Sequence, residues 1–335
     1  MAGQKKRLFT GLQPSGALHI GNYFGSLKPF LSLYEEYESF LMVADLHALT
    51  SLKDPALLHG NIYNIVRDYL AVGVDPKKAV LFRQSENQDH AELAWVLNCQ
   101  VTVPFLMQAH AYKDKVAKGL EPNAGLFTYP MLMAADILLY DADIVPVGED
   151  QRQHIEYARE AAVKFNRAYS PVLLSDSNLD VSNMSVPDEH KILKEPREHI
   201  LKGVGIVPGT DGQKMSKSYK NTIPLFGEKD EIAKAVMSIV TDSSGETPKN
   251  VYAIHALFRS EEELSALYEE KKGKYKDLKE ALIEDIETFV RPMREKRAEI
   301  SDADVRKVLD EGRERARAVS KAKMAAVQEA IGMGA

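Results

Sequence analysis

The chain has 335 residues, of which 44% are hydrophobic and 27% are charged, and its formal net charge is -6. This length allows a sizeable core and two domains. The acidic balance argues against a protein that coats nucleic acid indiscriminately, and the single cysteine, Cys99, excludes an intrachain disulfide framework or a cysteine-based metal cluster.

The sequence carries no pattern that predicts export or membrane insertion. The lysines near the N-terminus are not followed by an apolar stretch long enough for a signal peptide. No run approaches the roughly 18 apolar residues that predict a membrane span. A cytoplasmic protein without a membrane segment is therefore expected.

The first predicted elements are a strand, a turn and a helix. Residues 7–10 are strand-like, and helical spacing starts near Tyr23. Gly11, Pro14 and Gly16 between them predict a tight turn. Such a turn can bind phosphate, because free N–H groups and the positive end of the helix dipole point there. A purely structural turn has the same composition.

Apolar runs and helical segments then alternate. Strands are predicted at 38–43 and 79–82, and a helix between them starts at Asp54-Pro55 and runs to about Leu70. This alternation with short connections predicts an α/β fold with a parallel sheet. Because ligands lie outside the carboxyl ends of such strands, the polar residues that follow each strand are expected on one rim.

Residues 88–125 are helical in pattern and long for a crossover, which predicts an insertion that suits a dimer contact or a local cap on the sheet. The apolar block 128–140 follows, in which Asp136 shares a helical face with Met133 and Tyr140. A buried carboxylate must have a partner. A neighbouring group of the protein and an N–H donor on a ligand both satisfy this requirement.

A further strand is predicted at 143–147, followed by a helix that opens with residues 148–154. The acidic side chains at this opening suit ribose hydroxyls or an α-ammonium group. Residues 171–208 begin and end at a proline, carry two more at Pro187 and Pro196 and have many polar side chains. They are interpreted as irregular connecting structure over the site.

Residues 209–218 have loop composition, with two lysines and two serines in Lys214–Ser218. Such a loop is suited to close over a polyphosphate, although a lysine-rich loop is also common as solvated surface. From Glu228 onward the pattern is helical, with a capping box at Ser260–Glu263. Residues 291–323 hold 11 Lys or Arg against 7 Asp or Glu, which suits either an RNA contact or a solvated face.

Two of these segments together resemble the class I aminoacyl-tRNA synthetases. His19-Ile20-Gly21-Asn22 is similar to their first motif, and Lys214–Ser218 reproduces the second, KMSKS, letter for letter. Residues 11–16, Asn22 and the blocks 133–140 and 143–154 resemble the tryptophanyl-tRNA synthetases in particular. The resemblance covers essentially the whole chain and is thinnest in 171–210 and the C-terminal helices.

The resemblance implies a Rossmann-like catalytic domain over 1–220 and an all-helical C-terminal domain over 221–335 that binds the tRNA anticodon. The implied reaction joins L-tryptophan to ATP as tryptophanyl-adenylate and then transfers the amino acid to tRNA(Trp). ATP and Mg²⁺ are implied, with Mg²⁺ held mainly by the ATP phosphates and no protein metal site, and a homodimer is expected.

The resemblance also implies roles residue by residue. Catalytic roles are implied for Lys217, Lys214, Gln13 and His19. ATP contacts are implied for Gln13, Pro14, Ser15, His19, Gly21, Asn22, Gly148, Glu149, Asp150, Ile206, Lys214, Met215, Ser216, Lys217 and Ser218. Asp136 is the implied acceptor of the indole N–H, and the other implied tryptophan contacts are Phe9, His47, Tyr129, Met133, Val145, Val147 and Gln151.

Three features depart from the family pattern. Position 19 is His where many tryptophan enzymes carry Thr, Leu46 stands where a glutamine is common, and the 171–208 region is unusual. Together they suggest an auxiliary branch of the family. The alternatives are a tyrosyl-tRNA synthetase, a non-catalytic RNA-binding synthetase paralogue and a small-molecule adenylyltransferase.

Overall fold

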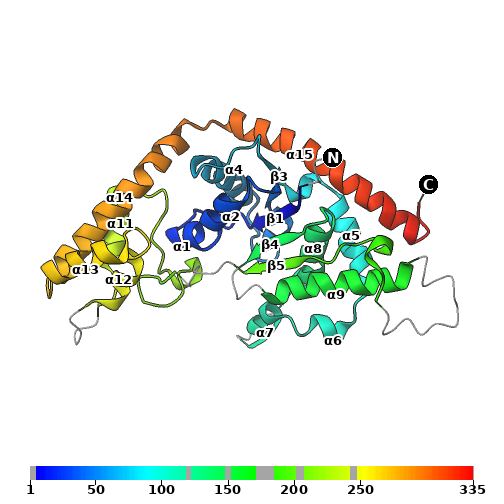
Figure 1. The fold of residues 1–335 in the computed structure, drawn as a ribbon, viewed down its shortest axis with the longest axis horizontal. Helices are drawn as coiled ribbons and strands as arrows, with labels where there is room; N and C mark the ends of the chain where they lie inside the picture. The colour runs from blue at the N-terminus through cyan, green and yellow to red at the C-terminus, as the bar shows by residue number, and fades with distance from the viewer. Residues whose placement is uncertain are drawn as a thin grey trace.

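The computed structural model describes residues 5–117, 122–147, 152–170, 185–200, 207–241 and 247–334. At its centre, the described residues build a five-stranded sheet in the order β3-β2-β1-β4-β5, with every pairing parallel (Figure 1). The strands are β1 (Arg7–Leu12), β2 (Glu38–Val43), β3 (Ala79–Arg83), β4 (Ile144–Val147) and β5 (Arg197–Ile200). The predicted α/β fold with a parallel sheet is confirmed.

Strand β5 corrects the sequence interpretation. It lies within 171–208, which we interpreted as irregular, and this interpretation is wrong for residues 197–200. The strand pairs with β4 alone, at the edge of the sheet. Its sequence, Arg-Glu-His-Ile, lacks the continuous apolar run by which a central parallel strand is recognised.

The sheet is buried on both faces, because alternate side chains of each strand enter different cores. Leu8 of β1 belongs to the first core and Phe9 to the second. In β3, Leu81 and Phe82 divide in the same way. The two faces therefore need two separate layers of helices.

One layer shares the core of Leu8. Its elements are α1 (Ile20–Asn22), the π-helical turn η1 (Tyr23–Leu27), α2 (Lys28–Leu33), α4 (Pro55–Ala71), α11 (Lys229–Met237), α12 (Lys249–His255) and α14 (Tyr275–Glu299). Helix α4 begins at its N-cap Asp54, as predicted. The predicted capping box at Ser260–Glu263 is also present, at the start of α13 (Glu261–Glu270), which packs in a small core of its own.

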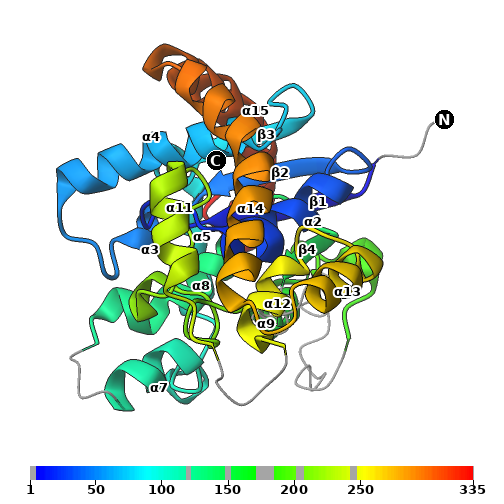
Figure 2. The same cartoon turned by 90° about the vertical axis from the view of Figure 1, so that its left-hand side faces the viewer.

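The other layer shares the core of Phe9. It contains α5 (Asp89–Asn98), α6 (Val103–Leu106), α8 (Ala124–Leu138) and α9 (Arg152–Tyr169). Figure 2 shows α7 (His110–Ala117) at the lower margin of the molecule, near α8. The remaining short elements are α3 (Asp45–Ala48) and the 3-10 turns η2 (Gln84–Glu86), η5 (Asp188–His190) and η6 (Lys217–Tyr219).

The last helix, α15 (Asp302–Ala330), joins the two cores by crossing the edge strand β3 (Figure 1). Its Leu309 lies in the first core and its Ala316 in the second. At the crossing, a Cβ on Gly312 would lie 1.8 Å from the Leu81 carbonyl oxygen, so only glycine permits this approach. The predicted domain boundary near residue 220 stays a prediction, while α15 packs directly on the sheet.

Among the described residues, none of the helices combines the length and the apolar composition needed to cross a bilayer.

Candidate active site

The turn after β1 is built as the sequence predicts. The Ser15 N–H donates to the Gln13 carbonyl at 2.8 Å, and Gly16 has a φ of +104°, in the region that favours glycine. Pro14 is buried, whereas Gln13 and Ser15 are exposed. The turn therefore presents its polar side chains outward, next to the start of the first helix.

His19 caps this helix through a reciprocal pair of hydrogen bonds. The Asn22 N–H donates to His19 Nδ1 at 3.2 Å, and the His19 N–H donates to Asn22 Oδ1 at 3.0 Å. Since Nδ1 accepts, the neutral ring carries its proton on Nε2. Burial, and then the charge of Lys217, lower the pKa of His19 to about 4. His19 is therefore a neutral donor at physiological pH.

This pKa predicts a pH dependence of stability. Below the ordinary value of 6.5 the unfolded chain takes up a proton that the folded ring refuses until about pH 4. Stability is therefore lost as the pH falls through this window, by on the order of 2 kcal/mol. Urea unfolding of the wild type and of His19→Asn, which keeps a capping oxygen and does not titrate, measures the effect. If the difference in unfolding free energy between the two proteins were constant from pH 7.5 to 4.5, the lowered pKa of His19 would be contradicted.

The two signature motifs meet in space. Residues 18–20 pair with residues 223–225 through two backbone bonds, Ile20 N–H to Ile223 O and Leu225 N–H to Leu18 O, both at 3.0 Å. Gly21 faces Met215: a Cβ on Gly21 would lie 3.2 Å from the Met215 Cβ. The two segments, almost 200 residues apart in sequence, thus form one surface.

Lys217 reaches across to the turn. Its ammonium donates to the carbonyl oxygen of Ser15 at 3.2 Å and lies 3.4 Å from the Ser15 hydroxyl. Burial lowers the pKa of Lys217, while the charge of Asp68 opposes this shift. A positive charge is thus held over a glycine turn at the carboxyl end of β1, where an anion is favoured.

The side chain of Asn221 stabilises the second motif through hydrogen bonds. Its side-chain oxygen accepts the Ser216 N–H at 2.7 Å, and its amide donates to the Lys214 carbonyl at 3.0 Å and to Asp211 at 2.7 Å. Ser216 also caps the turn η6, its hydroxyl accepting the Ser218 N–H. The loop predicted from composition is therefore an ordered turn in the structure.

Asp136 lies in α8, 1% exposed. His47 Nε2 contacts its Oδ2 at 2.8 Å, Gln84 donates to its Oδ1 at 2.7 Å, and His90 Nδ1 contacts the same oxygen at 2.6 Å. Burial opposes ionisation, but the hydrogen bonds from the two histidines outweigh it and lower the pKa of Asp136 to about 2. Asp136 is a carboxylate at every physiological pH.

This geometry bears on both interpretations of Asp136, a partner within the protein and a donor on a ligand. The carboxylate has partners within the protein, as the first interpretation required. A carboxylate offers about four lone-pair sites, and three are used by the described residues: two on Oδ1 and one on Oδ2. No described residue uses the second acceptor position on Oδ2, beside His47, which suits a donor such as an indole N–H.

Four predicted tryptophan contacts either share the core of α8 or contact a partner of this carboxylate. Phe9 is buried and stacks on Tyr140, with ring centroids 5.4 Å apart, and Val145 is buried in the same core. Met133 is half-buried on α8. Tyr129 meets the edge of the His47 ring, and burial raises the pKa of its hydroxyl to about 12.

Some of the predicted site residues are not described by the structure. Gly148, Glu149, Asp150, Gln151 and Ile206, together with the side chain of Val147, lie outside the described residues. Lys214 is exposed on the loop that carries Lys217. Within the parts of the chain that the structure describes, no cluster of three or more His, Cys, Asp or Glu side chains could hold a metal ion.

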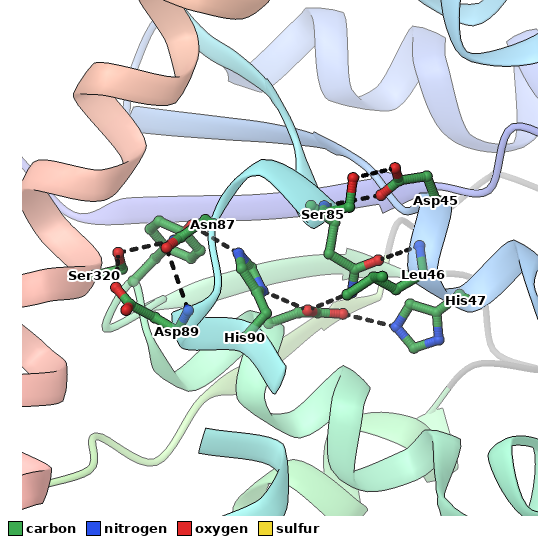
Figure 3. A network of polar contacts seen from close by, with 11 residues as sticks. Asp45, Leu46, His47, Ser85, Asn87, Asp89, His90 and Ser320 are labelled. Carbon is green, nitrogen blue, oxygen red and sulfur yellow. Dashed lines mark hydrogen bonds and ion pairs between the residues drawn. The ribbon is translucent and has the colours of Figure 1, made fainter. Parts of the chain in front are cut away.

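Gln84, Asn87 and His90 were not assigned a role from the sequence. They follow β3, and Figure 3 shows Ser85 of the same segment against Asp45, which follows β2. The sequence did contain a signal for these three residues, because polar residues that follow each strand were expected to meet on one rim of the sheet. Leu46, one of the departures from the family pattern, contributes its backbone N–H to Gln84 at 3.0 Å. The auxiliary branch inferred from such departures stays a prediction.

Comparison with known proteins gives a consistent result. Residues 1–303 match the family described as tRNA synthetases class I (W and Y). The chain is 45% identical to a tryptophan--tRNA ligase of Fusobacterium nucleatum, over 98% of each chain, and 44% identical to one of Rhodopirellula baltica, over 94% of this chain and 95% of the relative. It is similar to the crystal structure of Campylobacter jejuni tryptophanyl-tRNA synthetase complexed with ADP and tryptophan, with a TM-score of 0.85 and 38% identity over 97% and 99% of the two chains.

Proposed function

Because this chain belongs to the tRNA synthetases class I (W and Y), we propose that it activates L-tryptophan with ATP and transfers the tryptophanyl group to tRNA(Trp). The observation that carries this proposal is the position of the Lys217 ammonium, 3.2 Å from the carbonyl of Ser15 in the turn that precedes the first helix. A polyphosphate seated there meets a cation, backbone N–H groups and a neutral donor on His19.

In the first step a carboxylate oxygen of tryptophan forms a bond to the α-phosphorus of ATP, and the bond from that phosphorus to the β-phosphate bridging oxygen breaks. Pyrophosphate leaves with its negative charge. In the second step a hydroxyl of the terminal tRNA ribose attacks the adenylate carbonyl and AMP leaves. Neither step needs a covalent enzyme intermediate, so catalysis rests on positioning and on charge stabilisation.

The residues divide between the two substrates. Lys217, Lys214, Gln13 and His19 act on the phosphates, supported by Ser15, Gly21 and Asn22. ATP would bring Mg²⁺ with it, and this ion would supply charge neutralisation at the phosphates. Asp136 accepts the indole N–H on Oδ2, between apolar side chains that include Phe9 and Met133, and Tyr129 lies toward the amino-acid end.

We extend the proposal to the assembly. The insertion exposes Trp95, Val103 and Met107 on and near α5 and α6, which supports a homodimer contact there. The basic excess of residues 291–323 supports binding of tRNA by α14 and α15, in a helical C-terminal part that starts near residue 221. The cytoplasm, where tRNA is charged, is the proposed location.

ATP–pyrophosphate exchange with each of the twenty amino acids tests the function. Exchange is expected with tryptophan. With tyrosine and phenylalanine it should be at least about 10²-fold weaker, because a hydrogen-bond acceptor placed for the indole N–H rejects analogues that lack this donor. A preference for tyrosine would favour the tyrosyl enzyme. No exchange with any amino acid would favour a non-catalytic RNA-binding paralogue.

A further inference from the structure

A chain of hydrogen bonds runs from the C-terminal helix α15 toward helix α8. Ser320 of α15 donates to Asp89 at 2.6 Å and accepts from the Asn87 amide at 2.8 Å. The same amide donates to the Tyr140 hydroxyl at 3.2 Å. Figure 3 shows Ser320, Asn87 and Asp89 together at one end of this network, with His90 next to them.

The chain continues to the carboxylate of the proposed tryptophan site. His90 Nε2 lies 2.9 Å from the Tyr140 hydroxyl, and His90 Nδ1 lies 2.6 Å from Asp136 Oδ1. His90, Tyr140 and Ser320 are each 0% exposed. Because these groups are out of contact with solvent, bulk water cannot replace a partner that is lost.

The direction of every hydrogen bond in this chain follows from one group. The Asp89 backbone N–H lies 3.4 Å from Asn87 Oδ1, which orients the amide with its NH₂ toward Tyr140 and Ser320. An NH₂ group only donates, so the Tyr140 oxygen accepts from it and has its own proton for His90 Nε2. His90 then carries its ring proton on Nδ1 and donates it to Asp136.

This tautomer decides what Asp136 can do. With the proton on Nε2 instead, His90 would turn a lone pair toward Asp136 Oδ1 at 2.6 Å, and the carboxylate would have to move. With the proton on Nδ1, Oδ1 is filled by His90 and Gln84, and the acceptor position that no described residue uses is on Oδ2. The tautomer therefore sets which oxygen faces the substrate.

We propose that Ser320, Asn87, Tyr140 and His90 are positioning residues that hold Asp136 in the orientation that accepts the indole N–H, so that helix α15 helps to determine tryptophan specificity. This inference rests on the proposed function, in that Asp136 is taken as the acceptor for the substrate. It assigns to α15 a role in amino-acid binding besides any contact with tRNA.

Tyr140→Phe tests the central link. It removes the hydroxyl and keeps the ring that packs on Phe9. We expect the KM for tryptophan to rise about tenfold, with kcat and the KM for ATP within twofold of wild type. The tenfold rise corresponds to a loss of about 1.4 kcal/mol in the free energy of tryptophan binding, because Asp136 is no longer held in the accepting orientation. Tyr69→Phe is the matched control: Tyr69 is also fully buried, and its hydroxyl has no hydrogen-bond partner among the described residues.

Ser320→Ala tests the link to α15. We expect a rise of about threefold in the KM for tryptophan, against none for Ser265→Ala, a serine on the exposed side of α13 whose hydroxyl bonds only its own helix among the described residues. Because Ser320 acts through Tyr140, the double variant should be no worse than Tyr140→Phe. Additive effects in the double variant would overturn the chain.

A readout independent of activity separates this inference from the proposed function. The ¹⁵N shifts of His90 in the labelled wild type should report the Nδ1–H tautomer with Nε2 as a hydrogen-bond acceptor. In Tyr140→Phe the Nε2 resonance should shift, because Nε2 loses its donor, while Nδ1 keeps its proton toward Asp136. An Nε2–H tautomer in the wild type, or an unchanged KM for tryptophan in Tyr140→Phe with normal exchange by the wild type, would overturn the positioning chain alone. Absence of tryptophan-dependent exchange by the wild type would instead overturn the proposed function.

Discussion

Lys217→Ala is expected to lower the rate of tryptophan-dependent pyrophosphate exchange by roughly 10² or more, with tryptophan binding nearly unchanged. The ammonium lies over the turn at Ser15, and a Cβ on Gly16 would be 3.7 Å from it. The charge that develops on the leaving pyrophosphate would lose this cation. Asp136 lies in α8 and its carboxylate contacts His47, Gln84 and His90 rather than the turn at Ser15, so the indole contacts should remain.

Lys220→Asn is the matched control for this prediction. Lys220 lies three residues further along the same turn, is exposed, and has a φ of +53°, which asparagine tolerates well. The Lys220→Asn substitution removes the same formal charge as Lys217→Ala and keeps the contact between Lys217 and Ser15. Pre-steady-state measurement of adenylate formation and equilibrium binding of tryptophan give the two quantities. Equal loss in both variants would mean that net charge, rather than the placed ammonium, matters.

Asp136→Asn is expected to lower kcat/KM for tryptophan on the order of 10²-fold and to reduce the preference over phenylalanine by at least tenfold. The amide keeps the size of the carboxylate but replaces one acceptor oxygen by a donor. That NH₂ would face either His90 and Gln84 or His47 and the indole N–H, and in both cases donors oppose donors.

The control for Asp136→Asn is a second histidine–carboxylate pair. His255 Nε2 lies 2.6 Å from Asp285, which also pairs with Arg259, in the helical layer formed by α12 and α14. Asp285→Asn should cost stability without a change in amino-acid selectivity. Competition between tryptophan and phenylalanine in pyrophosphate exchange measures the selectivity. If Asp136→Asn kept the wild-type preference, the carboxylate would not be the indole acceptor.

Short-range patterns were sufficient for most of the fold. Four of the five strands, the N-cap at Asp54 and the capping box at Ser260 depend on residues that are neighbours in the sequence, and each was predicted close to its observed place. Strand β5 was missed because an edge strand with one partner needs no continuous apolar run. Its position depends on β4 rather than on its own composition.

The site divides in the same way. The two motifs and the buried position of Asp136 could be read from residue types and spacing, because glycine, lysine and a carboxylate on an apolar helical face each carry their chemistry with them. Their assembly was not visible in the sequence: residues 18–20 pair with 223–225, and Lys217 reaches Ser15, through contacts that span about 200 residues.

Sequence patterns thus established the α/β architecture, the glycine turn after the first strand, the lysine motif and the carboxylate, because each depends on local spacing and residue chemistry. Packing in three dimensions established the partners of that carboxylate and the crossing of α15 over β3, where Gly312 meets Leu81 and Ser320 reaches Asn87. The contacts of α15 join residues more than 200 positions apart, and the contacts of the carboxylate join residues 46 to 89 positions apart. Only the folded chain brings them to hydrogen-bond distance, and no local pattern records which distant group will complete a buried polar site.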